Sequence, residues 1–186
     1  EELVAHAHHL GWQAVGIADR FSCGGLVRAH MAIKDIAAQN NPDQKPVASL
    51  SLHKLICGVG VSLHNGGDIL CYSRTLDGYH SLCQWLSAAM MRSGHNNRAL
   101  PDMHISDLVR LSSDVIVITL PPVLADTDYR EQARTIRLFA PGDVYVGGYL
   151  MRDGCDEERL YRFSQEAAAD NLGFVALGHV LYHRPD

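Results

Sequence analysis

Hydrophobic positions along the chain follow two alternating patterns, one typical of helices and one typical of buried strands. Apolar residues three and four positions apart predict helices over residues 1–10, 25–38, 77–91, 105–111, 128–139 and 156–172. Short, β-branched apolar runs between them predict strands over residues 12–18, 54–63, 69–72, 114–119, 143–150 and 174–177. This alternation indicates one α/β domain with a mostly parallel sheet.

Two details refine the predicted sheet. The run over 12–18 is apolar at nearly every position, so we expect this strand to be buried on both faces. The dipeptide Asn65-Gly66 separates two strand-like runs and favours a tight hairpin, which predicts a local antiparallel pair within the sheet.

Composition limits the functions that the chain can have on its own. The 186 residues include 16 Lys and Arg against 21 Asp and Glu, giving a formal charge of −5. This balance argues against a self-sufficient nucleic-acid binder, although a domain attached to a larger DNA-handling protein stays possible. We find no apolar run long enough for a membrane span and no leader-like segment. The first residue is Glu1, and we expect the chain to be a fragment of a longer protein.

Cysteine and histidine residues are the next candidates for chemistry. The five cysteines are widely spaced and form no C-x-x-C pair, so we expect free, mostly structural thiols in a reducing, cytoplasmic protein. Eleven histidines occur, but a metal site needs several ligands that converge on one point. For most of these histidines, the sequence does not indicate further ligands that would converge on the same point.

The carboxyl ends of parallel strands are where α/β folds place functional residues. Asp19 and Arg20 follow the first predicted strand, and His179 and His183 follow the last. One carboxylate and two imidazoles can bind a divalent metal. In the alternative, which we favour, Asp19 caps a turn or helix and the histidines are surface residues, because hydrolytic metal sites usually contain more carboxylates. The sequence contains no nucleotide-binding glycine loop and no G-x-S-x-G elbow.

Several segments carry a family resemblance. They are LGWQAVGIADR at 10–20, GLVRAH at 25–30, DILCYS at 68–73, GYHSL at 78–82 and GHVLYHRPD at 178–186. In order and spacing they resemble the PHP (polymerase and histidinol phosphatase) domain of bacterial family C DNA polymerases, particularly the error-prone polymerase III alpha type. The resemblance implies that residues 1–186 are a single PHP-like domain. It also implies a distorted, mostly parallel (βα)7 barrel, similar in plan to a TIM barrel, that here lacks its first strand.

The same resemblance implies a metal site that has lost most of its ligands. Active relatives bind up to three metals through His and acidic residues at the barrel mouth. In this chain Asp19 matches the family pattern, but Arg20 stands where the family has His, and Gly60 stands where it has an acidic residue. The final Asp-x-His pair appears as His179-Val180-Leu181. Asp19, His179 and His183 are therefore the remaining metal-ligand candidates of a vestigial site.

These observations favour a degenerate, non-catalytic PHP domain of an error-prone, translesion DNA polymerase, with no catalytic residue and no cofactor of its own. It would give structural support within a nucleotidyltransferase of DNA replication and repair. Its partners would be the remainder of the polymerase chain, mutasome proteins, and DNA only through the parent polymerase, with no membrane. A homodimer of the fragment could cover the strand edge left unpaired.

Two other interpretations stay open at this point. One is a metal-dependent phosphoesterase or 3′–5′ exonuclease that uses zinc or manganese. The other is a stand-alone PHP-like interaction module. The first predicts bound metal, and the second predicts that no polymerase sequence follows Asp186.

Overall fold

The computed structural model describes residues 1–39, 54–64, 66–93, 101–122 and 129–178. The strands in this part of the chain are β1 (Ala14–Arg20), β2 (Lys54–Leu63), β3 (Gly67–Ser73), β4 (Val115–Leu120), β5 (Val144–Gly148) and β6 (Gly173–Ala176). The helices are α1 (Glu2–His9), α2 (Gly24–Gln39), α3 (Leu76–Arg92), α4 (Tyr129–Phe139) and α5 (Asp156–Ala169), with a 3₁₀ helix, η1, at Ile105–Arg110. The predicted α/β alternation is confirmed.

The six described strands form one sheet in the order β1-β2-β3-β4-β5-β6. The pairs β1–β2, β4–β5 and β5–β6 are parallel, whereas β3 runs antiparallel to both of its neighbours. The mostly parallel sheet and the antiparallel hairpin are therefore as predicted, although Asn65 itself lies outside the described residues. A short hairpin reverses the chain between β2 and β3, whereas the connections through α4 and α5 let β4, β5 and β6 run parallel.

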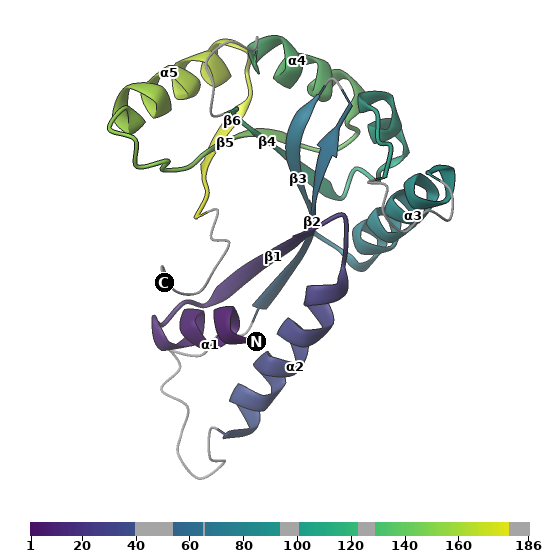
Figure 1. The fold of residues 1–186 in the computed structure, drawn as a ribbon, viewed down its shortest axis with the longest axis vertical. Helices are drawn as coiled ribbons and strands as arrows, with labels where there is room; N and C mark the ends of the chain where they lie inside the picture. Colours follow the sequence, from purple (N-terminus) through teal and green to yellow (C-terminus); the bar gives the residue numbers. More distant parts are fainter. Residues whose placement is uncertain (40–53, 65, 94–100, 123–128, 179–186) are drawn as a thin grey trace.

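Figure 1 shows the sheet as an open arc, with α3, α4 and α5 along its outer side. Within the described residues β1 and β6 are the two edges and do not pair with each other. The (βα)7 barrel lacking its first strand, which the resemblance implies, is thus not confirmed. The sheet that the structure describes is open.

The two faces of the sheet differ in burial because successive residues of a strand point to opposite sides. On the outer face Val59, Ile69 and Val117 are almost completely buried, and they pack with α3 and α4 in the larger hydrophobic cluster. On the inner, concave face Leu70 and Tyr72 are only partly buried. The helices cover the outer face and leave the inner face to form the wall of a cleft.

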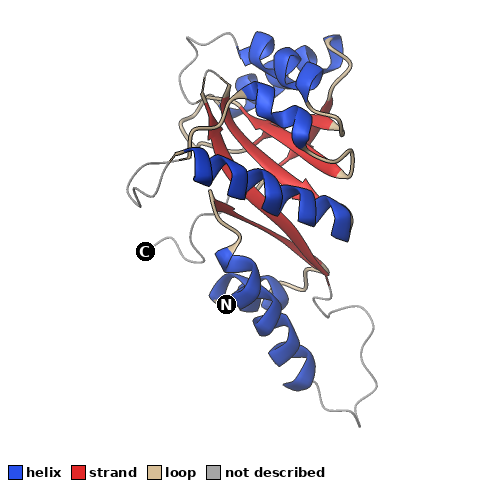
Figure 2. Ribbon diagram, turned by 90° about the vertical axis from the view of Figure 1, so that its right-hand side faces the viewer, coloured by secondary structure: helices blue, strands red, loops and turns tan. Residues whose placement is uncertain are grey.

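A second, smaller hydrophobic cluster surrounds the start of the sheet. Its buried members are Val4, Ala7, Val15 and Ala29, contributed by α1, β1 and α2. Figure 2 shows α1 and α2 at one end of the molecule, away from the helices that cover the rest of the sheet. The β1–β2 pairing connects this end to the larger cluster.

The first strand corrects one prediction. We expected a strand over 12–18 buried on both faces, but β1 starts at Ala14 and only Val15 is buried in it. The reason is its position: β1 is an edge strand of the described sheet, and its inner face borders the cleft. Asp19 and Arg20, expected to follow the strand, are its last two residues.

Other differences concern the ends of elements. The helix predicted over 156–172 ends at Ala169, because Asn171 has a left-handed backbone (φ 54°) that stops the helix. The segment predicted as a short helix over 105–111 is the 3₁₀ helix η1. Phe139, the last residue of the helix predicted over 128–139, is 39% exposed at the end of α4. Within the described ranges, no helix is both long and apolar enough to span a membrane.

Candidate functional site

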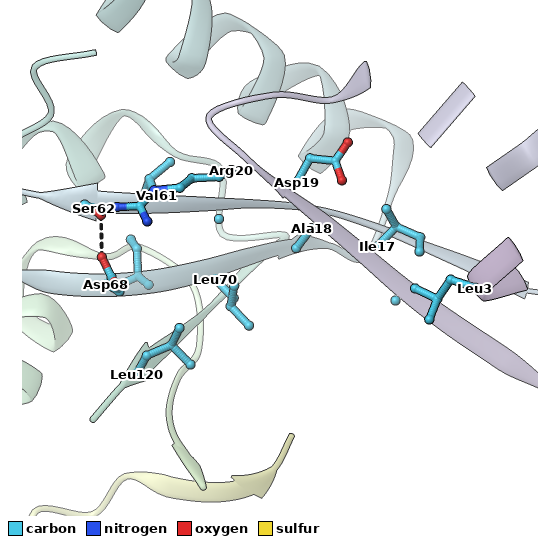
Figure 3. A pocket seen from close by; sticks show the side chains of 13 residues that line it. Leu3, Ile17, Ala18, Asp19, Arg20, Val61, Ser62, Asp68, Leu70 and Leu120 are labelled. Atoms are coloured by element: carbon cyan, nitrogen blue, oxygen red, sulfur yellow. Dashed lines mark hydrogen bonds between the residues drawn. The ribbon is translucent and has the colours of Figure 1, made fainter. Parts of the chain in front are cut away.

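A cleft of 420 Å³ opens on the inner face of the sheet where β1 and β2 end. Thirteen residues of the first four strands and of α1 line it, and Figure 3 labels ten of them: Leu3, Ile17, Ala18, Asp19, Arg20, Val61, Ser62, Asp68, Leu70 and Leu120. Gly60 also belongs to the lining. The structure therefore brings together Asp19, Arg20 and Gly60, three of the residues singled out from the sequence. His179 and His183 lie outside the described residues.

The Asp19 carboxylate is hydrogen-bonded to the backbone of α2. Its Oδ2 accepts a hydrogen bond from the Gly25 amide at 2.6 Å, near the first turn of that helix. Helix N-termini present unpaired N–H groups and a partial positive charge, which a carboxylate neutralises. Figure 3 shows the Asp19 side chain turned away from Arg20. This geometry is the capping role that the sequence left open as an alternative to metal binding.

Arg20 faces the opposite way and lies over the hairpin of β2 and β3. Its Nη2 donates to Ser62 Oγ at 2.6 Å, and Ser62 Oγ donates in turn to Asp68 Oδ1. Ser62 and Asp68 are register partners across the two strands, which places both beside the guanidinium. The chain Arg20–Ser62–Asp68, named here the arginine relay, connects a cation to a carboxylate through one hydroxyl.

Sequence reasoning missed Ser62 and Asp68 as members of the site. The available signal was the alternation along β3: Asp68 shares a face with Leu70 and Tyr72, and that face lines the cleft. An acidic residue at the start of an otherwise apolar strand face indicates a polar partner on the neighbouring strand. That partner could not be identified until the β2–β3 register was known.

Gly60 forms part of the cleft floor beside the arginine relay. It pairs in register with Arg20, and its carbonyl accepts from the Phe21 amide at 2.8 Å. A Cβ added at Gly60 would meet Leu70 Cδ2 at 3.4 Å and the Ala18 carbonyl oxygen at 3.5 Å, which are ordinary contacts. The position therefore has room for a side chain, but in this sequence backbone alone forms the floor.

The described part of the cleft holds two carboxylates, and each has a partner within the protein. Asp19 binds a helix amide, and Asp68 binds the arginine relay. Across all described residues, no three His, Cys, Asp or Glu side chains converge in a way that could hold a metal ion. The described lining offers a guanidinium, two carboxylates that are already hydrogen-bonded, and apolar walls.

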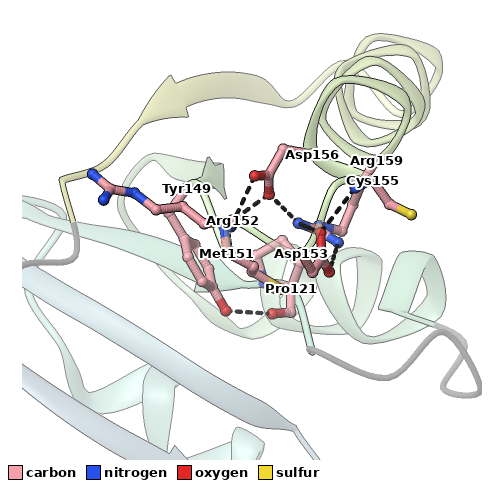
Figure 4. Close-up of polar contacts among 8 residues, drawn as sticks. All are labelled: Pro121, Tyr149, Met151, Arg152, Asp153, Cys155, Asp156 and Arg159. Carbon is pink, nitrogen blue, oxygen red and sulfur yellow. Dashed lines mark hydrogen bonds and ion pairs between the residues drawn. The ribbon is translucent and has the colours of Figure 1, made fainter.

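A second polar network holds the loop that follows β5 (Figure 4). Asp156 accepts hydrogen bonds from the Met151 and Arg152 amides, both at 2.8 Å, and Arg159 bridges Asp156 and Asp153. Hydrogen bonding to Arg159 lowers the pKa of Asp153 below its usual value. Both carboxylates and the guanidinium are used to fix the loop, so the acidic residues after β5 have a structural role.

No family model matches the chain. The chain is 29% identical to the error-prone DNA polymerase of Brucella abortus over 187 residues, which covers all of the chain and 16% of the polymerase. It is 30% identical to error-prone DNA polymerase 2 of Agrobacterium fabrum over 185 residues, covering all of the chain and 15% of that polymerase. The resemblance to error-prone DNA polymerases is confirmed.

A third error-prone DNA polymerase shows the same relation. The error-prone DNA polymerase of Bordetella parapertussis is 28% identical over 196 residues, covering 99% of the chain and 17% of the polymerase. The chain thus spans about one sixth of the length of the error-prone polymerases that it matches. The similarity concerns one segment of these large proteins.

Proposed function

We propose that this chain is a PHP-like domain of an error-prone DNA polymerase that has lost metal-dependent catalysis and acts as a structural support within the polymerase. The observation that carries the proposal is the hydrogen bonding of the polar side chains in the cleft. The resemblance implies that Asp19 is a metal ligand, but its carboxylate accepts a hydrogen bond from the backbone near the N-terminus of α2. The arginine relay lies beside it in the same cleft.

The chemistry of arginine supports this interpretation. A guanidinium stays protonated at every physiological pH and has no lone pair for a metal. Its positive charge in the cleft opposes the binding of a divalent cation, and its hydrogen bonds satisfy Ser62, which bonds Asp68. The arginine relay gives the Asp68 carboxylate the positive charge that a metal ion would otherwise supply, but it provides no Lewis acid to activate water.

The similarity to segments of error-prone polymerases supports the wider role. As part of this proposal, the domain contacts the remainder of the polymerase chain and mutasome proteins in the cytoplasm and meets DNA only through the parent enzyme during translesion synthesis. The open edge at β1 is the surface where another segment or a second copy would pair.

Metal content tests the proposal directly. Protein purified without a nickel column should contain less than about a tenth of an equivalent of zinc, manganese or iron by mass spectrometry, since few metal ligands remain. It should also leave the 3′ ends of single-stranded DNA intact in the presence of Mn²⁺.

Two variants at one position separate the structural role from the catalytic one. Asp19→Asn keeps an oxygen that accepts from the Gly25 amide but weakens any metal site, whereas Asp19→Ala removes both functions. About one equivalent of metal in the unmodified protein, lost in Asp19→Asn, would overturn the proposal. It would identify the cleft as a phosphoesterase or exonuclease site that uses zinc or manganese.

A further inference from the structure

Two histidines meet where the end of β2 touches the segment that leads into η1. His64 follows the last residue of β2, and its amide donates to the Met103 carbonyl at 2.7 Å. His64 and His104 also form an isolated parallel bridge, and their ring centroids are 5.2 Å apart with 61° between the ring planes. Backbone hydrogen bonding thus holds two imidazoles side by side on segments that are far apart in sequence.

A carboxylate lies beside the two imidazoles. Asp102 Oδ1 is 3.3 Å from His104 Nε2, and the two side chains are 64% and 49% exposed. His64 is exposed as well. An ion in solution can therefore reach all three side chains. We call His64, His104 and Asp102 the histidine group.

The backbone and the charges around the histidine group are set by its neighbours. The His104 amide donates to Asp107 Oδ2 at 3.1 Å, and the His104 carbonyl accepts from the Asp107 amide at 2.9 Å. Arg92 donates to Asp107 Oδ2 at 2.6 Å and to the Asp102 carbonyl oxygen at 3.2 Å. The charge of Arg92 is balanced by Asp107, so the Asp102 carboxylate leaves a negative charge beside the imidazoles.

The spacings within the histidine group match those of ligands on one tetrahedral zinc ion. With bonds from zinc to nitrogen or oxygen of about 2.0–2.1 Å, two imidazole centroids lie about 5.1–5.3 Å apart, and a nitrogen and an oxygen ligand lie about 3.3–3.4 Å apart. The 5.2 Å between the two rings and the 3.3 Å between Asp102 Oδ1 and His104 Nε2 fall within these ranges. Backbone movement is therefore not needed to bring the three ligands to one ion.

A side-chain rotation would complete the site. As the side chains lie, no three potential ligands among the described residues converge in a way that could hold a metal ion. The His64 ring is exposed, so it can turn about its Cβ–Cγ bond without displacing a buried core residue. Imidazole nitrogen suits zinc, nickel and copper, whereas magnesium and calcium favour oxygen ligands.

We propose that His64, His104 and Asp102 bind a divalent transition-metal ion such as zinc, with water in the remaining coordination position. None of the three residues lines the cleft, so this site is separate from the one discussed under the proposed function. A bound ion would connect the end of β2 to the segment before η1 and stabilise the folded chain. Since the ligands are few and exposed, we expect the ion to exchange freely and to be lost during purification.

The test titrates Zn²⁺ into the full 186-residue chain, without an affinity tag and after removal of metal with EDTA. Calorimetry should detect about one equivalent of bound Zn²⁺, and Mg²⁺ should give no signal because it prefers oxygen ligands. His64→Gln and His104→Gln should each weaken Zn²⁺ binding at least about tenfold, and Asp102→Asn should weaken it several-fold.

Matched controls use exposed histidines elsewhere in the described chain. His80→Gln on α3 should leave Zn²⁺ binding unchanged. His6 and His9 on α1 are a competing pair of exposed imidazoles, and His6→Gln should also have no effect. Zn²⁺ binding that survives the combined His64→Gln and His104→Gln variant, in the cleft or on α1, would overturn the proposal. So would the absence of any Zn²⁺ binding by the unmodified chain.

A second measurement needs no variant. Diethyl pyrocarbonate transfers a carbethoxy group to accessible imidazole nitrogen, releasing ethanol and carbon dioxide, and peptide mapping locates each modified histidine. Zn²⁺ should slow the modification of His64 and His104 together but leave that of His80 unchanged. If either His64 or His104 reacts at the same rate with and without Zn²⁺, the two imidazoles do not share an ion and the proposal is wrong.

Discussion

At the scale of single residues, Asp19 shows how one carboxylate can fit two different interpretations. Its position at the carboxyl end of β1 matches that of a functional residue in an α/β fold, and its side chain lies at the N-terminus of α2. A Cβ at Gly25 would lie 2.3 Å from Asp19 Oδ2, so the helix backbone and the carboxylate are in close contact. The structure assigns Asp19 a role in folding that does not depend on any ligand.

Substitutions at Asp19 should therefore change stability in a graded way. Asp19→Ala should lower the free energy of unfolding by about 1–2 kcal/mol, because a charge-assisted bond to a helix amide is lost. Asp19→Asn should cost less than about half of that, since its amide oxygen still accepts. Urea unfolding measures both, and the exposed Asp35→Ala on α2 serves as the control. Equal losses for Asn and Ala would contradict a capping role.

At the scale of elements, strand β2 owes its close packing to glycine. A Cβ at Gly58 would lie 2.5 Å from Tyr72 Cδ1 and 3.0 Å from the Cys71 carbonyl oxygen. The Tyr72 ring also covers Gly16 on β1, at 3.2 Å from its Cβ position. One aromatic ring thus fills the space above two neighbouring strands.

Two alanine substitutions on this strand should differ sharply. Gly58→Ala forces the Tyr72 ring to move and should cost about 1–3 kcal/mol, whereas Gly60→Ala meets only ordinary contacts and should cost much less. In a Tyr72→Leu background the cost of Gly58→Ala should shrink, because the ring that it displaces is gone. Thermal unfolding of the four variants tests this, and equal costs at Gly58 and Gly60 would refute it.

Helices α4 and α5 are held together by an ion triad. Asp170, at the C-terminal end of α5, is 7% exposed and accepts from Arg130 and Arg134. Hydrogen bonds from Arg130 and then Arg134 hold the pKa of this carboxyl far below its usual value. A carboxylate is unfavourable at a helix C-terminus, and the two guanidinium groups compensate for it.

This triad predicts how stability depends on pH. Because the pKa of Asp170 is lowered by folding, its contribution is complete above the unfolded value of about 3.9 and is lost as pH falls further. Urea midpoints of the unmodified protein should therefore drop more steeply between about pH 4 and pH 2 than those of Asp170→Asn. Parallel slopes would contradict the assignment, and Asp35→Asn provides the control.

Most of the helices and strands could be predicted from the amino-acid sequence. The apolar run that became β2 has the predicted bounds, and α3, predicted over 77–91, extends by only one residue at each end. Periodicity could not predict the exposure of β1, because burial on the inner face depends on which elements cover it. The arginine relay was hidden for a similar reason: Ser62 and Asp68 become partners only through the register of the hairpin.

At the scale of the whole molecule, the separation into two hydrophobic clusters is the main feature. The first four residues of β2, Lys54 to Cys57, pair with β1 but not with β3, so this end of the sheet is a two-stranded ribbon. Among the described residues, the smaller cluster has four buried hydrophobic members, against the many that pack around β3 and β4. The α1–β1–α2 end should be the less stable part.

Hydrogen exchange can test this difference within one sample. Amides of α1 and α2 should exchange at least about tenfold faster than those of β3 and β4, because local opening of the small cluster requires less free energy than global unfolding. Uniform protection across both clusters in the reduced protein would show that the chain opens as one unit.

The capping bond of Asp19 also has an evolutionary consequence. In a domain that loses its chemistry, neutral drift removes ligands whose only function was catalysis, but a residue with a folding role stays under selection. Under the proposed function, Asp19 would persist for this reason beside Arg20 and Gly60, positions where the resemblance implies metal ligands in active relatives. The number of metal-ligand residues that such a lineage retains then overstates its remaining activity, because a retained residue can be one that the backbone needs for folding.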